Sequence, residues 1–393
     1  MKDFWKDEKL ESHKLNKRKL IIIILLSIIL LFIITILILY NTLPDFQNWI
    51  DKNILNKEVM QNSATTIELE DENAKVYAFN KNIIILSKNK LKIYNNFGNK
   101  DAELDVEIAN PIFASSNRFV AIAEDNGKKI YVLEDKKIVW DGEIEGEISQ
   151  VHINKNGYVA VVITGTSHKS VVAMFDNKGT PLFKTFLSST RLADVSISND
   201  NKHLALAEID TSGTIIQSNI KIVSVEKAQL DSTNSMEKIY KGQTNSLIIN
   251  IKYQDNNKLI CMYDDSIHII ADENDEVLVD YSNQKINFSS VELNNNIVNV
   301  KEQSSGLFTA DSIATIIDTG NKNVKTYKTD SVTKEIKTYE NIIALNLGSE
   351  IEFINTDGWL VKRYIAKQEI TNTVLSNSVA AIIYRDKVEI INL

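Results

Sequence analysis

The segment INKNGYVAVVI, residues 153–163, carries the local pattern that decides the fold. A short strand ends in a polar turn that contains asparagine, and an apolar run rich in β-branched residues follows. Asparagine accepts positive φ angles more readily than most residues with a side chain. It therefore suits tight turns in a chain with only 13 glycines among 393 residues. The segment predicts two antiparallel strands joined by such a turn.

The same unit recurs along the chain at intervals of roughly 35 to 55 residues. Its other copies are FNKNIIIL (79–86), ASSNRFVAIA (114–123), ISNDNKHLALA (197–207), YQDNNKLICMY (253–263), ELNNNIVNV (292–300), TYENIIALNL (338–347) and LSNSVAAII (375–383). A second strand–turn–strand segment follows most copies, as in YNNFGNKDAEL (94–104), FDNKGTPLFKTF (175–186), ADENDEVLVDY (271–281) and INTDGWLVKRY (354–364). Four short strands in about 40 residues are typical of one propeller blade.

The pattern therefore predicts an all-β fold, a β-propeller of about eight four-stranded blades over residues 65–393. Another large antiparallel sandwich would supply strands, but it would give no reason for eight similar units. The last unit contains only three strands, in NTVLSN (372–377), VAAIIYR (379–385) and KVEIINL (387–393). We predict that TTIELE (65–70) supplies the outer fourth strand of that blade and so closes the ring, which leaves no unpaired edge. A ring of seven blades is the alternative.

The repeated units resemble the β-propeller superfamily, in particular PQQ-like and WD40-like blades, over roughly residues 65–393. The dipeptide of WD40 blades occurs once, as Trp140-Asp141, on the fourth strand of its unit and without the matching Gly-His, so we interpret it as a coincidence. With its N-terminal region, described next, the chain also resembles an uncharacterised family of membrane-anchored propellers from Gram-positive bacteria. That resemblance implies a fold and a location but no activity.

Residues 20–40, LIIIILLSIILLFIITILILY, form an uncharged apolar run. Twenty-one residues in a helix span roughly 32 Å, enough to cross the hydrocarbon core of a membrane. A cleaved signal peptide would have a shorter apolar run followed by small residues, whereas Tyr40-Asn41-Thr42-Leu43-Pro44 follows here. The run predicts an uncleaved transmembrane helix that serves as a signal-anchor.

The segments on either side of this run set its expected orientation. The tail of residues 1–19 contains seven basic and four acidic residues, which gives it a net charge of +3. Because the whole chain has a net charge of −8, residues 20–393 together have a net charge of −11. By the positive-inside rule, the tail is cytoplasmic and the propeller lies outside the cytoplasm. Residues 41–64 form a juxtamembrane linker in which Phe46, Trp49, Ile50 and Ile54 recur at helical spacing. This amphipathic helix would lie at the membrane surface or pack on the propeller.

Candidate catalytic and metal-binding residues are scattered. His13 lies in the tail, and His152, His168, His203 and His268 fall in different units without the spacing of a metal motif. The acidic run at 272–276 lacks the glycine and final glutamate of a calcium loop, and Gly165–Ser170 matches neither a nucleophile elbow nor a phosphate loop. With Cys261 as the one cysteine, a cysteine zinc site and a disulfide framework are excluded. The sequence predicts no catalytic residue, no cofactor site and no metal site.

Three functional classes fit these features. The favoured hypothesis is a non-enzymatic binding or scaffold propeller, tethered to the membrane, that recognises a cell-envelope protein or glycan. The total net charge of −8 disfavours nucleic acid as a partner. The negative charge of the part beyond the tail disfavours anionic wall polymers held by charge alone. A propeller-type lyase or hydrolase is the second hypothesis, and it would need carboxylates, histidine or arginine to converge at the propeller axis. The third is a sensor that signals through a separate membrane partner, because nineteen tail residues are too few for an output domain.

Overall fold

The computed structural model describes residues 17–42, 46, 50, 54, 65–304, 310–376 and 378–393. The chain divides into two compact units, Met1–Asn56 and Lys57–Leu393. The predicted tail up to residue 16 and most of the predicted amphipathic segment 41–64 lie outside the described residues.

In the first unit, helix α1 runs from Lys17 to Thr42 and contains the apolar span Ile21–Tyr40. The hydroxyls of Ser27, Thr35 and Thr42 donate to the carbonyls four residues earlier at 2.7–2.8 Å, so these polar groups are satisfied within the helix. By length and composition α1 can cross a membrane, and a signal sequence would meet the same two criteria.

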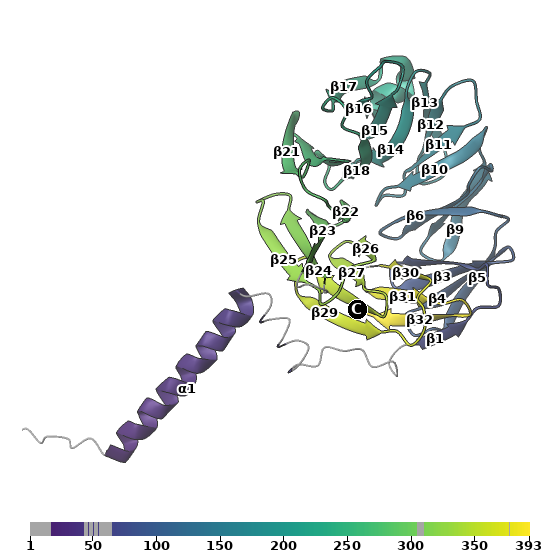
Figure 1. Ribbon diagram of the computed structural model, residues 1–393. Coiled ribbons are helices and arrows are strands. Elements are labelled where there is room, and N and C mark those ends of the chain that lie inside the picture. The colour runs from purple at the N-terminus through teal and green to yellow at the C-terminus, as the bar shows by residue number, and fades with distance from the viewer. Residues whose placement is uncertain are drawn as a thin grey trace, which may run out of the picture. The chain divides into compact units, whose positions relative to one another are not determined.

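The second unit is a ring of eight four-stranded antiparallel sheets, as predicted (Figure 1). Blades 1 to 4 consist of β2 (Lys75–Phe79), β3 (Asn82–Ser87), β4 (Lys90–Asn95), β5 (Lys100–Asp105); β6 (Pro111–Ser116), β7 (Phe119–Glu124), β8 (Lys129–Glu134), β9 (Lys137–Glu143); β10 (Glu147–Ile153), β11 (Val159–Thr164), β12 (Ser170–Phe175), β13 (Pro181–Leu187); and β14 (Arg191–Ile197), β15 (His203–Asp210), β16 (Gln217–Ser224), β17 (Met236–Lys241). Blades 5 to 7 consist of β18 (Ile248–Tyr253), β19 (Lys258–Tyr263), β20 (Ser266–Ala271), β21 (Asn274–Asp280); β22 (Phe288–Ser290), β23 (Asn296–Ser304), β24 (Ala310–Asp318), β25 (Val324–Lys328); and β26 (Glu335–Tyr339), β27 (Ile342–Asn346), β28 (Glu350–Asn355), β29 (Leu360–Ile365).

Blade 8 joins the two ends of the propeller. Its strands are β30 (Asn372–Leu375), β31 (Val379–Ile383) and β32 (Lys387–Asn392), and β1 (Thr65–Glu68) is the outermost strand of the same sheet. β1 pairs antiparallel with β32, with Thr65 opposite Ile390 and Glu68 opposite Lys387. The predicted closure by residues 65–70 and the count of eight blades are thus confirmed.

The core lies between the blades rather than at one centre. Eight clusters of buried apolar side chains each combine residues of two neighbouring blades, including one between blades 8 and 1 that contains Ile67, Val76 and Val388. Each apolar run in the repeated units supplies such residues from the second strand of a blade. A blade therefore buries its two faces only when both neighbours are present.

The tight turns follow the expectation for asparagine. Asn80, Asn117, Asn201 and Asn295 have φ angles of 51°, 53°, 64° and 49° in the turns between the first and second strands of their blades. Blade 4 departs from the predicted plain hairpins. Between β16 and β17 the chain forms α3 (Val225–Leu230) and the short 3-10 helix η2 (Ser232–Asn234), and the Ser224 side chain caps α3 by accepting from the Lys227 amide at 3.4 Å.

Trp140, from the WD dipeptide, has a packing role in the ring. It lies on β9, the fourth strand of blade 2, and its ring centroid is 5.6 Å from that of Phe175 in blade 3. The indole also covers Gly179, where φ is +80° and an added Cβ would lie 2.7 Å from the ring. Trp140 thus stabilises the contact between blades 2 and 3.

Candidate axial site

The inner strands of blades 3 to 6 bring four ionisable side chains into one cavity at the propeller axis. The cavity has a volume of about 330 Å³, and its lining includes His152 of β10, Asp194 of β14, Lys252 of β18 and Glu292, two residues after β22. β10, β14 and β18 are the inner edge strands of their sheets and line the axis, so polar side chains on these strands can reach a shared cavity. The site therefore arises from residues that are distant in the sequence.

Asp194 links the inner strands of blades 4 and 5. Its Oδ2 atom accepts from the Ile251 amide at 2.8 Å, and its Oδ1 atom accepts from the Val195 amide at 2.8 Å. Its side chain is only 10% exposed, and burial raises its pKa to about 7, against the effect of these two amides. The carboxyl group is therefore partly protonated at neutral pH.

His152 lies beside this carboxyl group as a neutral imidazole. Its Nε2 atom is 3.6 Å from Asp194 Oδ1 and 3.2 Å from Gln150 Oε1, and the Gln150 amide donates to the Ala193 carbonyl at 3.1 Å. Burial lowers the pKa of His152 to about 4, and the nearby Lys252 ammonium acts in the same direction. At neutral pH the imidazole adds hydrogen-bonding capacity to the cavity but no charge.

Lys252 and Glu292 form an ion pair on the cavity wall. The Nζ atom donates to Glu292 Oε2 at 2.7 Å, and the two side chains are 40% and 43% exposed. The Glu292 carboxylate raises the pKa of Lys252, which stays protonated. The opposite charges of this pair cancel within the cavity wall.

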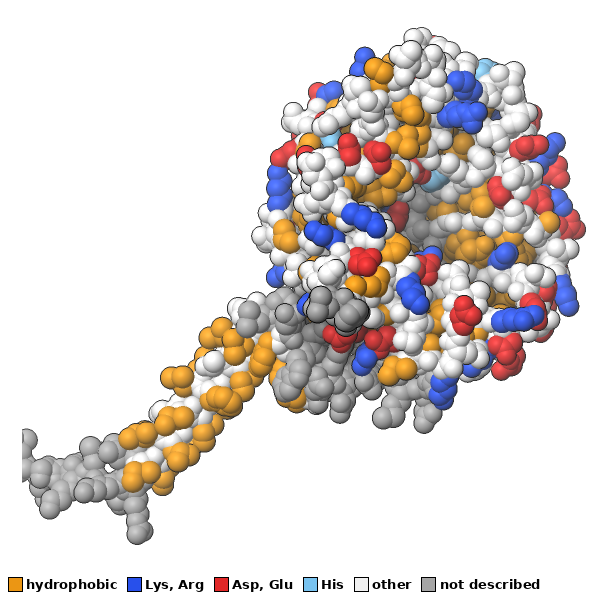
Figure 2. Space-filling view, viewed as in Figure 1, with side chains coloured by type: hydrophobic (Ala, Val, Ile, Leu, Met, Phe, Trp, Pro, Cys, Tyr) orange, Lys and Arg blue, Asp and Glu red, His pale blue; other side chains and the backbone are white. Residues whose placement is uncertain are grey.

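The cavity continues toward both faces of the ring. One adjoining cavity of about 600 Å³ shares Ser115, Asn199 and Lys252 with it and extends to the turns that follow the inner strands. Another of about 320 Å³ shares His152 and Asn250 with it. Figure 2 shows one face of the ring, hollowed near its centre, with hydrophobic side chains on part of the wall. A ligand therefore has a route to the ionisable groups.

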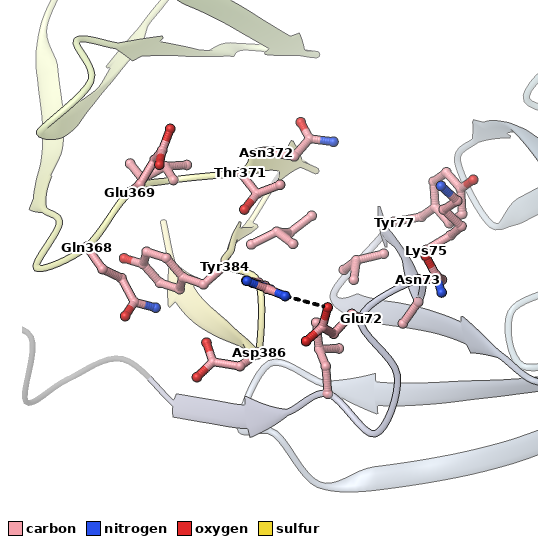
Figure 3. Close-up of a pocket in the computed structure, with 16 residues that line it drawn as sticks. Glu72, Asn73, Lys75, Tyr77, Gln368, Glu369, Thr371, Asn372, Tyr384 and Asp386 are labelled. Carbon is pink, nitrogen blue, oxygen red and sulfur yellow. Dashed lines mark hydrogen bonds and ion pairs between the residues drawn. The ribbon is translucent and has the colours of Figure 1, made fainter.

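Another cavity, of about 1030 Å³, lies at the junction of blades 8 and 1 (Figure 3). Glu72 and Arg385 form an ion pair of 3.0 Å across this junction. Tyr77 lines this cavity and Phe113 lines the axial cavity, and the two rings stack with centroids 4.1 Å apart. The stacked rings thus form a wall between the two cavities.

Of the candidate residues that the sequence analysis considered, His152 lies in the axial cavity, and the others lie elsewhere or outside the described residues. His168 lies in the β11–β12 turn against Phe186, His203 pairs with Glu237 at 3.3 Å, and His268 pairs with Asp275 at 2.8 Å. His13 lies outside the described residues. Residues 272–276 form the β20–β21 hairpin. Among the described residues, no group of three or more His, Cys, Asp or Glu side chains is placed to hold a metal ion.

The sequence reasoning did not find the axial cluster. Asp194, Lys252 and Glu292 each lie two to five residues before the first asparagine of a polar turn, and their immediate neighbours in the sequence are mostly apolar or small. The sequence signal that could have indicated the site is an ionisable residue in or just after the first strand of several successive units. That signal becomes informative only when the units are known to surround one axis.

Comparison with known proteins gives one family match and several solved structures that are similar. A model of a family of unknown function, DUF5711, matches residues 55–393. The crystal structure of BamB from Moraxella catarrhalis is similar with a TM-score of 0.51 and 11% identity, over 84% of this chain and 98% of that one. The β-propeller domain of Cps50 (Swd1) from Myceliophteria thermophila gives 0.46 and 11%, over 84% and 100%. No curated protein matches the sequence.

Proposed function

The chain belongs to the DUF5711 family of unknown function, and we propose that it is a membrane-tethered propeller that binds a cell-envelope protein or polymer outside the cytoplasm, without catalysis. The observation that carries this proposal is the closed eight-bladed ring, whose accessible axial cavity is lined by polar groups with balanced charge. Rigid strands position these groups, as recognition requires. Helix α1, with its apolar span Ile21–Tyr40, supplies the tether.

The contacts of the axial groups favour binding over catalysis. A side-chain nucleophile is commonly activated by a general base within hydrogen-bond distance. His152 and Asp194 are 3.6 Å apart, and His152 contacts the Gln150 amide group instead. Lys252 is protonated and paired with Glu292. Each group has a structural role that requires no reaction.

The proposed orientation can be tested by cysteine labelling in intact cells. The native Cys261 is fully buried, so it does not react with a membrane-impermeant maleimide in the folded protein. A Thr211→Cys substitution in the exposed β15–β16 turn should be labelled from outside, whereas Ser12→Cys in the tail should react only after the cells are opened. Labelling of the tail alone in intact cells would reverse the topology.

The binding function is tested by photo-crosslinking on intact cells. A photoreactive amino acid at Asn117 or Asn295, in turns at one end of the axial cavity, should trap a specific envelope component. The same group at Phe97, an exposed residue in the outer β4–β5 turn, should trap less of it. Equal capture at all three positions would contradict recognition at the axis.

A lyase or hydrolase is the second candidate function. The observation in its favour is Asp194, a carboxyl group with a pKa of about 7 in a cavity that also contains a neutral imidazole. Such perturbed groups are common at active sites. Turnover of an envelope glycan or peptide by the full chain, lost in Asp194→Asn, would establish an enzyme and refute the proposal of binding alone.

A further inference from the structure

We propose that the axial cavity is a binding site for a neutral carbohydrate, held by hydrogen bonds from amide and hydroxyl side chains. This inference rests on the binding function proposed above and specifies the ligand of that site. It is carried by the charge balance, the hydrogen-bonding groups and the aromatic wall of the cavity.

The charge balance excludes strong attraction for an ion. The Lys252 ammonium and the Glu292 carboxylate are 2.7 Å apart, so each already has its counter-charge. An anionic ligand in the cavity would have to give up hydration without gaining a free cation, which costs several kcal/mol in general. A cationic ligand would find only the partly protonated Asp194, whose two oxygens already accept from backbone amides. A neutral ligand avoids that cost and can still hydrogen-bond to both members of the pair.

The lining provides donors and acceptors in a number that suits a polyhydroxylated molecule. Besides the four ionisable groups, the cavity is lined by Ser115, Ser116, Asn154, Ser196, Asn199 and Asn250. The Asn250 Oδ1 atom is buried and has no hydrogen-bond partner among the described residues. A buried acceptor without a donor costs about 1–3 kcal/mol. Because Asn250 itself lines the cavity, a half-turn of its amide plane would present this oxygen to a ligand hydroxyl and remove the cost. Sugar hydroxyls provide many such donors on one small ring.

An apolar surface completes the site. Phe113 lines the cavity, and its ring is held rigid because it stacks on Tyr77 with an angle of 6° between the planes. The two faces of a sugar ring expose C–H groups, which pack on aromatic surfaces. Ligand sites commonly combine such a surface with a few placed polar groups in cavities of about 300–1,000 Å³. The 330 Å³ cavity and the adjoining one of 600 Å³ fall in this range.

The test uses titration calorimetry with the full chain in lipid nanodiscs. The neutral probes are chitotetraose, maltotetraose, cellotetraose and mannotetraose, and the charged probes are a cationic chitosan tetramer and an anionic galacturonate tetramer. We expect at least one neutral tetramer to bind at least tenfold more tightly than both charged ones at pH 7. Binding of the charged tetramers with equal or higher affinity, or no binding of any neutral tetramer at millimolar concentration, would overturn the inference.

Two variants locate the binding in the cavity. Asn250→Leu keeps the side-chain volume but removes the unpaired acceptor, and we expect at least a tenfold loss of affinity for the neutral tetramer. Asn219→Leu is the matched control, because Asn219 also has a buried, unpartnered Oδ1 atom but lies on β16, the third strand of blade 4, and does not line the cavity. Equal losses in the two variants would overturn the assignment to the axis.

A third variant tests the charge argument directly. Glu292→Gln leaves the Lys252 ammonium without its carboxylate, so the anionic galacturonate tetramer should gain at least tenfold in affinity. Unchanged thermal melting of each variant shows that the ring is intact. An unchanged preference for neutral tetramers in Glu292→Gln would refute charge balance as the basis of selectivity.

The outcomes also separate this inference from the proposed function. If no neutral tetramer binds while crosslinking in cells still traps an envelope component at the axial turns, only the ligand assignment fails. If crosslinking also traps nothing specific, the binding function fails with it. If a tetramer binds and is cleaved, the cavity is a carbohydrate site and the non-catalytic function is wrong.

Discussion

Replacing His152 with glutamine should change how the stability of the propeller depends on pH. Burial lowers the pKa of His152 from 6.5 to about 4 and raises that of Asp194 from 3.8 to about 7. Between about pH 4 and 6.5, His152 is protonated and Asp194 is ionised in the unfolded chain. In the folded chain, His152 is neutral and Asp194 is protonated over the same range. The two groups therefore have opposite effects on stability, and these effects largely cancel in the native protein.

The magnitude follows from linkage between protonation and folding. One pKa unit corresponds to about 1.4 kcal/mol. The penalty for keeping His152 neutral appears as the pH falls from 6.5 to 4 and reaches about 3 kcal/mol. The penalty for ionising buried Asp194 appears as the pH rises from 3.8 to 7 and reaches about 4 kcal/mol. When one of the two residues is replaced, the pH dependence of stability caused by the other residue should become measurable.

The assay is urea unfolding of the full chain in detergent, followed by tryptophan fluorescence from pH 4.5 to 7.5. Between pH 4.5 and 7, the unfolding free energy of His152→Gln relative to the native protein should fall by about 2.5 kcal/mol, and that of Asp194→Asn should rise by about 3 kcal/mol. The loss of one acceptor for the Ile251 or Val195 amide adds a pH-independent cost in Asp194→Asn. Lys252 and Glu292 are present in every variant, so their effects cancel in these differences.

The double variant is the internal control. With both groups removed, the difference from the native protein should change by less than about 1 kcal/mol over the same range, because the two single effects nearly cancel. If the difference between His152→Gln and the native protein stays constant within 0.5 kcal/mol, roughly the usual error of such comparisons, the imidazole is not held neutral by burial, and the description of the axial cavity is wrong.

Three further substitutions, one of them with a matched control, test the ring itself by equilibrium unfolding. Ile67→Ala on the closing strand should lower the unfolding free energy by about 2 kcal/mol, since Ile67 is 8% exposed in the core between blades 8 and 1; no loss would contradict closure by β1. Gly179→Ala should cost about 1–3 kcal/mol because its Cβ would clash with an indole at positive φ, whereas Gly142→Ala, with nothing within 4 Å, should be nearly neutral; similar costs would refute this packing. Tyr364→Phe should cost about 1–3 kcal/mol, because the Tyr364 hydroxyl donates to buried Glu389 at 2.6 Å, and a neutral result would show that this bond contributes little.

The strands, the blade count and the ring closure could be predicted because their causes are local. Alternation in a segment such as residues 65–70 sets which side chains face inward, and an asparagine such as Asn80 marks a turn wherever it lies in space. The α3 segment was missed because it is one short helix, which Ser224 caps with a single hydrogen bond. The apolar run of residues 20–40 is likewise a local property, and it predicted a helix of the observed type.

The axial site depended on the tertiary structure. His152, Asp194, Lys252 and Glu292 come from four blades, and only the closed ring turns their strands toward one cavity. Their pKa values also follow from that packing, because burial acts on His152 and Asp194 in opposite directions. The sequence determined the repeating unit, since strand and turn propensities act over a few residues. The structure decided the site, since proximity and burial depend on how all eight units close around the axis.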